Sequence, residues 1–211
     1  CGLGLGFLVE TPTGLYLVDC GSPGKEAVVL DKLRELGRSD LKMIWITHAH
    51  YDHYGSAARL RELTGAKIGV HPLDADSLIT GRTPLGTPRN YGFIYFLLQP
   101  LARVLRPLRP VQPDFTLGDG ETLERFGLDA TIVHTPGHTP GSSTLLLAEG
   151  TAFASDLLGS VTHPHLQSLL ATDWNALPLS LKHLQAAKPQ WVYAGHSHRP
   201  IPGDEFQAMQ G

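Results

Sequence analysis

The hydrophobic pattern at the start of the chain predicts a β-hairpin followed by a helix. Apolar runs over residues 5–10 and 15–19 flank Thr11-Pro12-Thr13-Gly14, whose composition is typical of a turn. The period then changes to that of a helix over residues 24–37, where one apolar stripe contains Val28, Val29, Leu33 and Leu36. Gly37 suits the C-terminal cap, because glycine readily adopts a left-handed conformation.

Beyond this helix, short apolar runs alternate with amphipathic segments. Strands are predicted over residues 43–47, 66–70, 115–117, 121–126, 129–134, 143–148, 151–154 and 191–194. Helices are predicted over residues 55–63 and 171–188, with a short terminal helix from residue 205 onward. In a chain of 211 residues, this alternation predicts one α/β domain with helices outside packed sheets.

Residues 81–113 interrupt the alternation. They contain six prolines, five arginines and no acidic residue, together with the aromatic residues Tyr91, Phe93, Tyr95 and Phe96. We expect this segment to be an insertion that projects from the core and forms a cap beside the functional site, setting substrate choice. A homodimer interface is the alternative, and peripheral membrane contact is a less favoured third interpretation.

Composition excludes several classes of protein. Apolar residues make up 42% of the chain and charged residues 18%, a balance typical of globular domains rather than disordered ones. The net charge of −3 gives no overall attraction to nucleic acid. The longest apolar run, residues 93–98, is far shorter than the ~20 residues that span a bilayer.

The spacing of the two cysteines, Cys1 and Cys20, does not argue for a disulfide, so we expect reduced thiols and a cytoplasmic location. The sequence begins at Cys1 rather than at methionine, and we expect further residues to precede it.

Histidine carries the strongest functional signal. The chain has eleven, and three of them, His48, His50 and His53, lie with Asp52 in one loop directly after the predicted strand over residues 43–47. Packing does not require three imidazoles within six residues, whereas imidazole and carboxylate groups are common metal ligands. The loop therefore predicts a metal site.

Three other strand ends carry the same kind of residue. His138 lies in a turn between two Pro-Gly pairs, which restrict the backbone and hold the side chain in place. Asp156 follows the strand over residues 151–154, and His196 follows the strand over residues 191–194. Since α/β proteins place reactive groups at strand ends, four such signals of one chemical kind indicate one shared site.

The motifs His-Ala-His-Tyr-Asp-His, Thr-Pro-Gly-His-Thr-Pro-Gly-Ser, Ser-Asp and Ala-Gly-His, in this order, resemble the metallo-β-lactamase superfamily over nearly the whole chain. The resemblance implies an α/β fold, a four-layer αβ/βα sandwich with two metal ions at one edge between the sheets. It implies a first metal held by His48, His50 and His138, and a second held by Asp52, His53 and His196. Asp156 would bridge the two metals. Asp19 would orient the ligands by hydrogen bonds without binding a metal itself.

The same resemblance implies hydrolysis by a metal-bridged hydroxide, which Asp52 would position while Asp156 bridges the two metals. Two Zn²⁺ ions per chain fit the donor set best, and Mn²⁺ or Fe²⁺ would also fit. His198 is a candidate for substrate contact, although a simple loop role is equally expected. The remaining histidines are interpreted as structural or solvated: His71, His134, His163, His165 and His183.

Comparison with branches of the superfamily narrows the expected reaction. Asp156 differs from the class B β-lactamases, and His50 occupies the position of a glutamate in the flavodiiron branch. Only fifteen residues follow His196, so we expect neither the helical extension of glyoxalase II nor the extra domain of nucleic-acid-processing members.

We therefore expect a hydrolase of ester, thioester, lactone or related acyl bonds. Its substrate would be a small molecule with an apolar part and an anionic part, the latter bound by an arginine of residues 81–113. Two alternatives stay open: β-lactam hydrolysis and a mononuclear iron persulfide dioxygenase.

Overall fold

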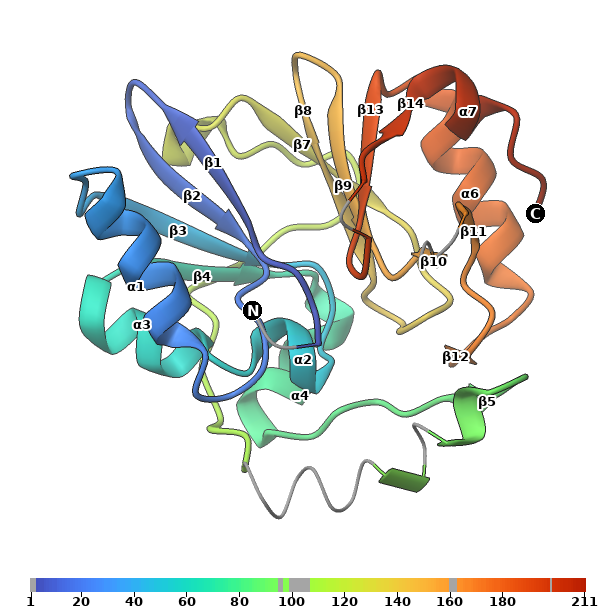
Figure 1. Cartoon of the computed structure of the whole chain (residues 1–211), viewed down its shortest axis with the longest axis horizontal. Coiled ribbons are helices and arrows are strands. Elements are labelled where there is room, and N and C mark those ends of the chain that lie inside the picture. The colour runs from blue at the N-terminus through green and yellow to red at the C-terminus, as the bar shows by residue number, and fades with distance from the viewer. Residues whose placement is uncertain (1–2, 95–96, 99–106, 160–162, 198) are drawn as a thin grey trace.

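The computed structural model describes residues 3–94, 97–98, 107–159, 163–197 and 199–211. Two five-stranded sheets face each other, and helices cover the outer face of each sheet (Figure 1). The architecture is the four-layer αβ/βα sandwich that the sequence predicts.

The N-terminal half contains the sheet with strand order β1-β2-β3-β4-β6. An antiparallel hairpin joins β1 to β2, and the later strands run parallel to β2, as the chain crosses over through helices. The strands are β1 (Phe7–Thr11), β2 (Gly14–Val18), β3 (Leu41–Ile46), β4 (Lys67–Val70) and β6 (Phe115–Thr116). The helices of this half are α1 (Glu26–Glu35), α2 (Tyr51–Tyr54), α3 (Ala57–Thr64) and α4 (Pro72–Thr80).

The C-terminal half contains the sheet with strand order β14-β13-β9-β8-β7, covered by α6 and α7 (Figure 1). Its strands are β7 (Ala130–His134), β8 (Ser143–Leu147), β9 (Thr151–Ser155), β13 (Trp191–Ala194) and β14 (Ile201–Pro202). Its helices are α6 (Ala176–Ala186) and α7 (Gly203–Gln207). Two short ribbons pair β10 (Leu158–Gly159) with β11 (His165–Leu166), and β12 (Leu170–Ala171) with β5 (Thr87–Pro88).

Three apolar clusters hold the layers together. One lies between the sheets and includes the fully buried Tyr16, Trp45 and Ile132, while the other two lie between each sheet and its helices. Removing one large apolar side chain from water contributes about 1.5–3 kcal/mol, so this packing fixes the relative position of the sheets. The strands β3, β7, β9 and β13 can therefore present their C-terminal ends as a rigid edge.

Some predicted elements are wrong in extent or type. The strand predicted over residues 121–126 is only a bridge between Thr122 and Thr131, followed by a 3₁₀ helix, η1 (Glu124–Phe126), because the chain turns at Gly127 with φ 84°. The helix predicted over residues 171–188 begins at Ala176, since residues 170–171 pair with β5. Helix α4 was not predicted at all.

The described part of residues 81–113 links the two halves of the molecule. It leaves α4, pairs through β5 with β12 of the C-terminal half, and returns to place a buried Val111 in the N-terminal core. Arg89 lies over the ring of Trp174 at 4.2 Å, which fixes the far end of the crossing. The segment thus runs along the molecule and is not wholly outside the core. Among the residues described, no helix is long and apolar enough to cross a membrane.

Candidate metal centre

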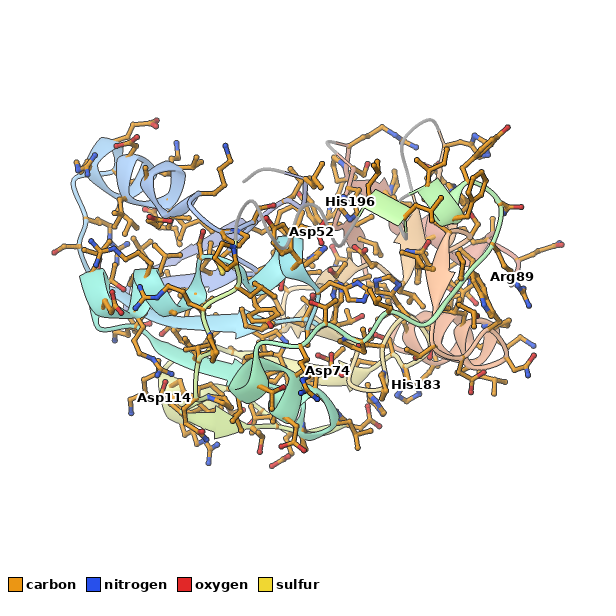
Figure 2. The ribbon with its side chains drawn as sticks, turned by 90° about the horizontal axis from the view of Figure 1, so that it is seen from below. Asp52, Asp74, Arg89, Asp114, His183 and His196 are labelled. Carbon is orange, nitrogen blue, oxygen red and sulfur yellow. The ribbon has the colours of Figure 1, made fainter. Side chains whose placement is uncertain are left out.

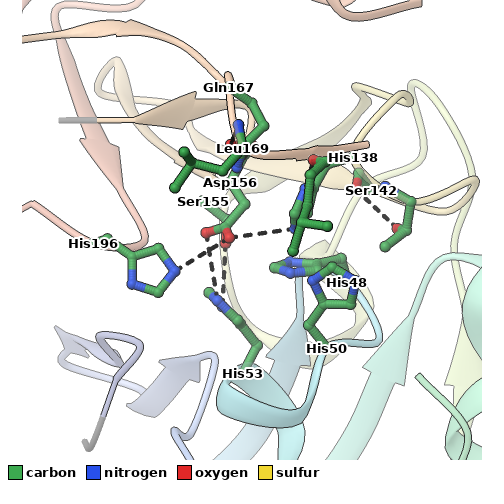
Figure 3. Close-up of polar contacts among 12 residues, drawn as sticks. His48, His50, His53, His138, Ser142, Ser155, Asp156, Gln167, Leu169 and His196 are labelled. Atoms are coloured by element: carbon green, nitrogen blue, oxygen red, sulfur yellow. Dashed lines mark hydrogen bonds and ion pairs between the residues drawn. The ribbon is translucent and has the colours of Figure 1, made fainter. Parts of the chain in front are cut away.

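Five histidines and two aspartates converge at the edge between the sheets. His48, His50, Asp52 and His53 lie in and after the loop that follows β3, a strand buried on both faces. The opposite sheet contributes the rest from the ends of three strands or their loops: His138, Asp156 and His196. The structure thus brings together the seven residues to which the sequence analysis assigned metal binding. Figure 3 labels all of them except Asp52.

A first group consists of His48, His50, His138 and Asp156, all of them buried. The ring of His138 lies 4.7 Å from that of His48 and 4.3 Å from that of His50, measured between centroids. The Nε2 atom of His138 lies 3.3 Å from Oδ2 of Asp156. Three imidazoles and one carboxylate around one point form a four-donor set of the kind that binds zinc or iron.

A second group consists of Asp52, His53 and His196. Oδ2 of Asp52 lies 3.9 Å from Nε2 of His53 and 3.7 Å from Nε2 of His196. The two oxygens of Asp156 lie 3.4 Å from Nε2 of His53 and 3.2 Å from Nε2 of His196. Asp156 therefore contacts both groups, which is the geometry that a bridging carboxylate needs.

Each of the five histidines has one ring nitrogen engaged by a partner away from the centre. Carbonyl oxygens accept hydrogen bonds from Nε2 of His50 (Pro84, 2.6 Å), Nδ1 of His138 (Leu170, 2.7 Å) and Nδ1 of His196 (Leu3, 3.0 Å). Nδ1 of His53 donates to Asp19 at 2.8 Å, and Nδ1 of His48 contacts Oγ1 of Thr47 at 3.1 Å. Such bonds fix the ring orientation, so the second nitrogen faces the centre, where it can bind a metal once it carries no proton.

Four buried atoms at the centre lack a hydrogen-bond partner among the residues described. They are Nε2 of His48, Nε2 of His53, Nε2 of His138 and Oδ1 of Asp156. Buried polar atoms without a partner are costly, and each such atom in a native fold needs an explanation. A bound divalent cation would satisfy atoms of this kind, so the residues present fit a metal site.

Burial and neighbouring charges shift the histidine pKa values in opposite directions in the two ligand groups. Burial holds the pKa of His48 and the pKa of His50 well below the ordinary histidine value, so both rings are neutral. Burial also lowers the pKa of His53, but the carboxylates of Asp156 and Asp19 outweigh it and raise the pKa to about 10. Asp156 likewise raises the pKa of His196 to about 9.

Asp156 is the anionic centre of both groups. Burial disfavours its charge, yet the neighbouring His196 and His53 hold the pKa of its carboxyl well below the ordinary value. A permanently ionised carboxylate between two sets of imidazoles is suited to cations.

Two buried carboxylates, Asp19 and Asp74, hold the metal-binding loops in place by hydrogen bonds. Asp19 accepts hydrogen bonds from the backbone N–H and the hydroxyl of Thr47, from Nδ1 of His53 and from Oγ of Ser155. The family pattern had indicated this supporting role. Asp74, in the first turn of α4, accepts hydrogen bonds from Ala49, Thr139 and Gly141. No sequence pattern singled out Asp74, because an aspartate in the first turn of a helix is common.

Two of the four non-glycine residues with positive φ in the described part of the chain lie at the same place. Asp19 and Ser155 adopt positive φ values of 57° and 46°, which cost about 1–3 kcal/mol for residues other than glycine. A Cβ atom on Gly195 would lie 2.4 Å from Oδ1 of Asp156 and 2.9 Å from Cε1 of His53. The Gly residue before His196 is therefore required by close approach of the backbone to the metal ligands.

A cavity of about 310 Å³ opens above the metal-binding residues. Its floor includes His50, Asp52, His138, Asp156 and His196. Its walls come mainly from the segment after Asp156 and from the N-terminal segment: Leu3, Leu158, Gly159, His165, Gln167, Leu169 and Leu170. A largely apolar wall above a polar floor is the usual form of a small-molecule site.

The cavity wall was not foreseen from the sequence. His165, interpreted as solvated or structural, lines the cavity, while no described residue of 81–113 is among the lining residues. Arg89 donates its backbone N–H to the carbonyl of Leu169, and the side chain of Asn90 donates to the carbonyl of Ser168. His198 lies outside the described residues.

Comparisons with known proteins identify the family of the chain. The family profile of the metallo-beta-lactamase superfamily matches residues 1–196. An uncharacterized protein of Mycobacterium tuberculosis is 28% identical over 163 residues, covering 70% of this chain and 68% of that protein. A hydroxyacylglutathione hydrolase of Shewanella halifaxensis is 28% identical over 154 residues, covering 73% of this chain but only 46% of the enzyme. Among solved structures, TTHA1623 in a di-iron-bound form is 27% identical with a TM-score of 0.70, covering 96% of this chain and 91% of that chain.

Proposed function

The chain belongs to the metallo-β-lactamase superfamily and is a metal-dependent hydrolase, and from this premise we propose that it holds two metal ions and cleaves an ester, thioester or lactone bond. The single observation that carries the proposal is the position of Asp156. Its carboxylate belongs to the first group of ligands and lies within 3.4 Å of His53 and His196 in the second.

We propose that His48, His50 and His138 hold the first ion, and that Asp52, His53 and His196 hold the second. Asp156 would contribute to both. When bound, a pair of divalent cations supplies Lewis acidity toward a substrate oxygen and makes water acidic enough to ionise near neutral pH. Zn²⁺ is the proposed metal, while the di-iron form of TTHA1623 supports iron as the alternative.

Asp52 and Asp156 border the cavity as well as the ligand groups, so both carboxylates can accept a hydrogen bond from a water molecule at the floor. A carboxylate in this position orients the attacking water and can receive its proton. His198 stays a proposed substrate contact.

The cavity supports an acyl substrate with a neutral, apolar group. Leu3, Leu158, Leu169 and Leu170 form its apolar surface, and none of the described lining residues is lysine or arginine. Among the described residues, the lining therefore offers no cationic side chain to the anionic part that the sequence analysis expected. The hydroxyacylglutathione hydrolase to which the chain is similar is named for a thioester substrate, which supports an acyl bond as the target.

A hydrolysis screen on metal-loaded protein tests the proposal. The panel contains p-nitrophenyl esters of increasing acyl length, lactones, thioesters, a β-lactam and a phosphodiester, with metal content measured on the same sample. We expect hydrolysis of the acyl substrates by protein with two ions per chain. Cleavage of only the phosphodiester or the β-lactam would contradict the acyl assignment. One iron per chain with oxygen consumption on a persulfide would favour the dioxygenase instead.

Chain-length preference tests the role of the wall. Leu169→Trp should narrow the cavity and shift the preference toward shorter acyl esters by about tenfold, since one methylene in an apolar pocket contributes about 1–3 kcal/mol. Leu179→Trp, at a site 67% exposed on α6, is the matched control and should leave the preference unchanged. An equal response of the two variants would exclude this wall as the acyl site.

A homodimer and a cytoplasmic location stay predictions.

A further inference from the structure

Asp74 is a fully buried carboxylate whose hydrogen bonds reach both loops that carry the three histidines of the first ligand group. Oδ2 accepts the backbone N–H of Ala49 at 2.8 Å and the hydroxyl of Thr139 at 2.7 Å. Oδ1 accepts the backbone N–H of Gly141 at 2.8 Å. Ala49 lies between His48 and His50, and Thr139 directly follows His138. One side chain therefore connects the three histidines of this group through their backbones.

The fit around Asp74 is close on every side. A Cβ atom on Gly141 would lie 2.7 Å from Cβ and Cγ of Asp74, so only glycine allows the turn after His138 to approach the helix this closely. The backbone N–H of Asp74 donates to the carbonyl of His71, whose ring nitrogen caps α4. The carboxylate is thus held by the helix as well as by the loops.

Helix α4 belongs to the N-terminal half, whereas the turn with His138 belongs to the C-terminal half. Asp74 consequently joins the two halves at the metal centre, and Figure 2 shows its side chain at the start of α4, beside the gap between the halves. The two halves must be held in register here, since His48 and His50 come from one and His138 from the other.

Both backbone groups bonded to Asp74 are obligate donors, so the site needs an acceptor at each carboxylate oxygen. An asparagine has the same shape but places an NH₂ group against either Ala49 or Gly141. One loop would then lose its anchor, and a buried donor without a partner costs about 1–3 kcal/mol.

We propose that Asp74 is the positioning residue of the first metal-binding group, and that it sets the affinity of that group alone by fixing the loops of His48, His50 and His138. The proposal rests on the two-metal function proposed above. Asp74 does not contact the second group, which has its own brace in Asp19. Loss of Asp74 should therefore release one ion and leave the other.

The test compares Asp74→Asn with Asp114→Asn. Asp114 is a matched control, because its carboxylate also accepts a backbone N–H, that of Ile68 at 2.8 Å, but at the far end of the N-terminal half (Figure 2). Each protein is loaded with Zn²⁺ and titrated with a chelator while released zinc is measured. We expect Asp74→Asn to lose one of its two ions at about 10–100-fold lower chelator concentration than the wild type, a loss typical of outer-shell partners. Asp114→Asn should match the wild type.

Cobalt identifies the group that is weakened. With one equivalent of Co²⁺, the visible spectrum of Asp74→Asn should resemble that of His138→Ala, which lacks a ligand of the first group, and differ from that of His196→Ala. Thr139→Val removes one of the three donors to Asp74 and should show a smaller effect of the same kind. Thr139→Val also keeps the proposal testable if Asp74→Asn does not fold.

The outcomes separate the two proposals. A wild-type protein that binds fewer than two ions would refute the two-metal function itself. Two ions in the wild type, with wild-type chelator resistance in Asp74→Asn or in a Thr139→Val that replaces it, would refute the role of Asp74. A cobalt spectrum of Asp74→Asn like that of His196→Ala would refute it as well.

Discussion

The metal centre and another cluster of histidines contain similar residues in different arrangements. This other cluster, here called the peripheral histidine cluster, consists of His71, His134, His183 and Asp119. In the metal centre, the available ring nitrogens converge on one another and on Asp156. In the cluster, His71 and His134 stack in parallel, with centroids 4.0 Å apart and planes 9° apart, so the ring edges do not meet at a point.

The side chains of the peripheral histidine cluster also differ from those of the metal centre in their hydrogen-bond partners. Nε2 of His134 donates to the carbonyl of Pro140 at 2.9 Å, and Nε2 of His183 contacts Asp119 at 3.1 Å. His71 accepts the N–H of Leu73 as a helix cap. Each of these rings pairs with its own neighbour, whereas the metal centre leaves buried atoms without partners among the described residues. Convergence of unpaired donors, rather than the density of histidines, distinguishes a metal site.

The largest difference between the two regions should appear in activity. His138→Ala and Asp52→Ala each remove a proposed ligand, and each should lower kcat/KM by more than about 100-fold, since even outer-shell changes reach 10–100-fold. His183→Ala is the control and should stay within about twofold of the wild type. Kinetics on the best acyl ester, with circular dichroism to confirm folding, measure this. Equal losses in His183→Ala and His138→Ala would show that the ligand assignment is wrong.

Metal content should show the next largest difference between the metal centre and the peripheral histidine cluster. Metal-loaded wild type should contain about two ions per chain by elemental analysis, and removing them should lower the melting temperature, because ligands that bind only the folded state stabilise it. At 100 times the dissociation constant, each ion contributes about 2.7 kcal/mol. A variant with His138→Ala and His196→Ala should retain no tightly bound ion, although its peripheral histidine cluster is intact. A retained ion would mean that the cluster binds metal itself.

The pH dependence of stability should reveal the cluster rather than the metal centre. Burial, together with His134, lowers the pKa of His71 from 6.5 to about 4. The folded protein therefore binds this proton less tightly than the unfolded chain does. The stability that the neutral ring provides is complete above pH 6.5 and is lost as the pH falls from 6.5 toward 4. His71→Asn keeps a capping acceptor and should remove this dependence.

The measurement is the difference in unfolding free energy between wild type and His71→Asn, both metal-free, at pH 7 and pH 5. We expect the difference to change in favour of the variant by on the order of 1 kcal/mol at pH 5, after allowance for partial contact of the ring with water. The other titrating groups cancel in this comparison. A difference that does not change with pH would contradict the low pKa of His71.

The smallest effect should come from the exposed ion pair of the cluster. His183 and Asp119 are both about half exposed, with side-chain exposures of 51% each, and such pairs contribute about 0–1 kcal/mol. His183→Ala should therefore change the melting temperature by no more than about 4 °C at pH 6 and pH 8. A larger drop would indicate that the cluster holds the two halves together more strongly than its contacts suggest.

Much of the fold could be predicted from the sequence because periodicity reports burial. The strands with continuous apolar runs, such as β2 and β3, are buried on both faces and were predicted to within two residues at each end. Short elements could not be found in this way. The two-residue strands β5 and β12 exist because they pair with each other across more than 80 positions of the chain, Pro88 with Leu170 and Thr87 with Ala171, and no local pattern encodes that contact.

The site shows the same division between local and distant information. The seven converging residues lie in compact motifs that chemistry and resemblance both single out. Asp74 and Pro84 act on the same site through a buried carboxylate and a backbone carbonyl, and both come from distant segments. Their contributions depend on tertiary contacts, and a carbonyl has no sequence signature at all. The cavity wall after Asp156 was missed for this reason too.

The connection of His196 to Leu3 has a consequence for biosynthesis. Residues 48–156 contain the whole first ligand group, whereas His196 is separated by 40 positions from Asp156. At about 5–20 residues per second, a ribosome needs roughly 2–8 s more to reach it. The nascent chain therefore carries every donor of one ion before the second set is complete. Until then, Leu3 and Leu5 lack the end of β13 with which their backbone groups form hydrogen bonds in the folded protein.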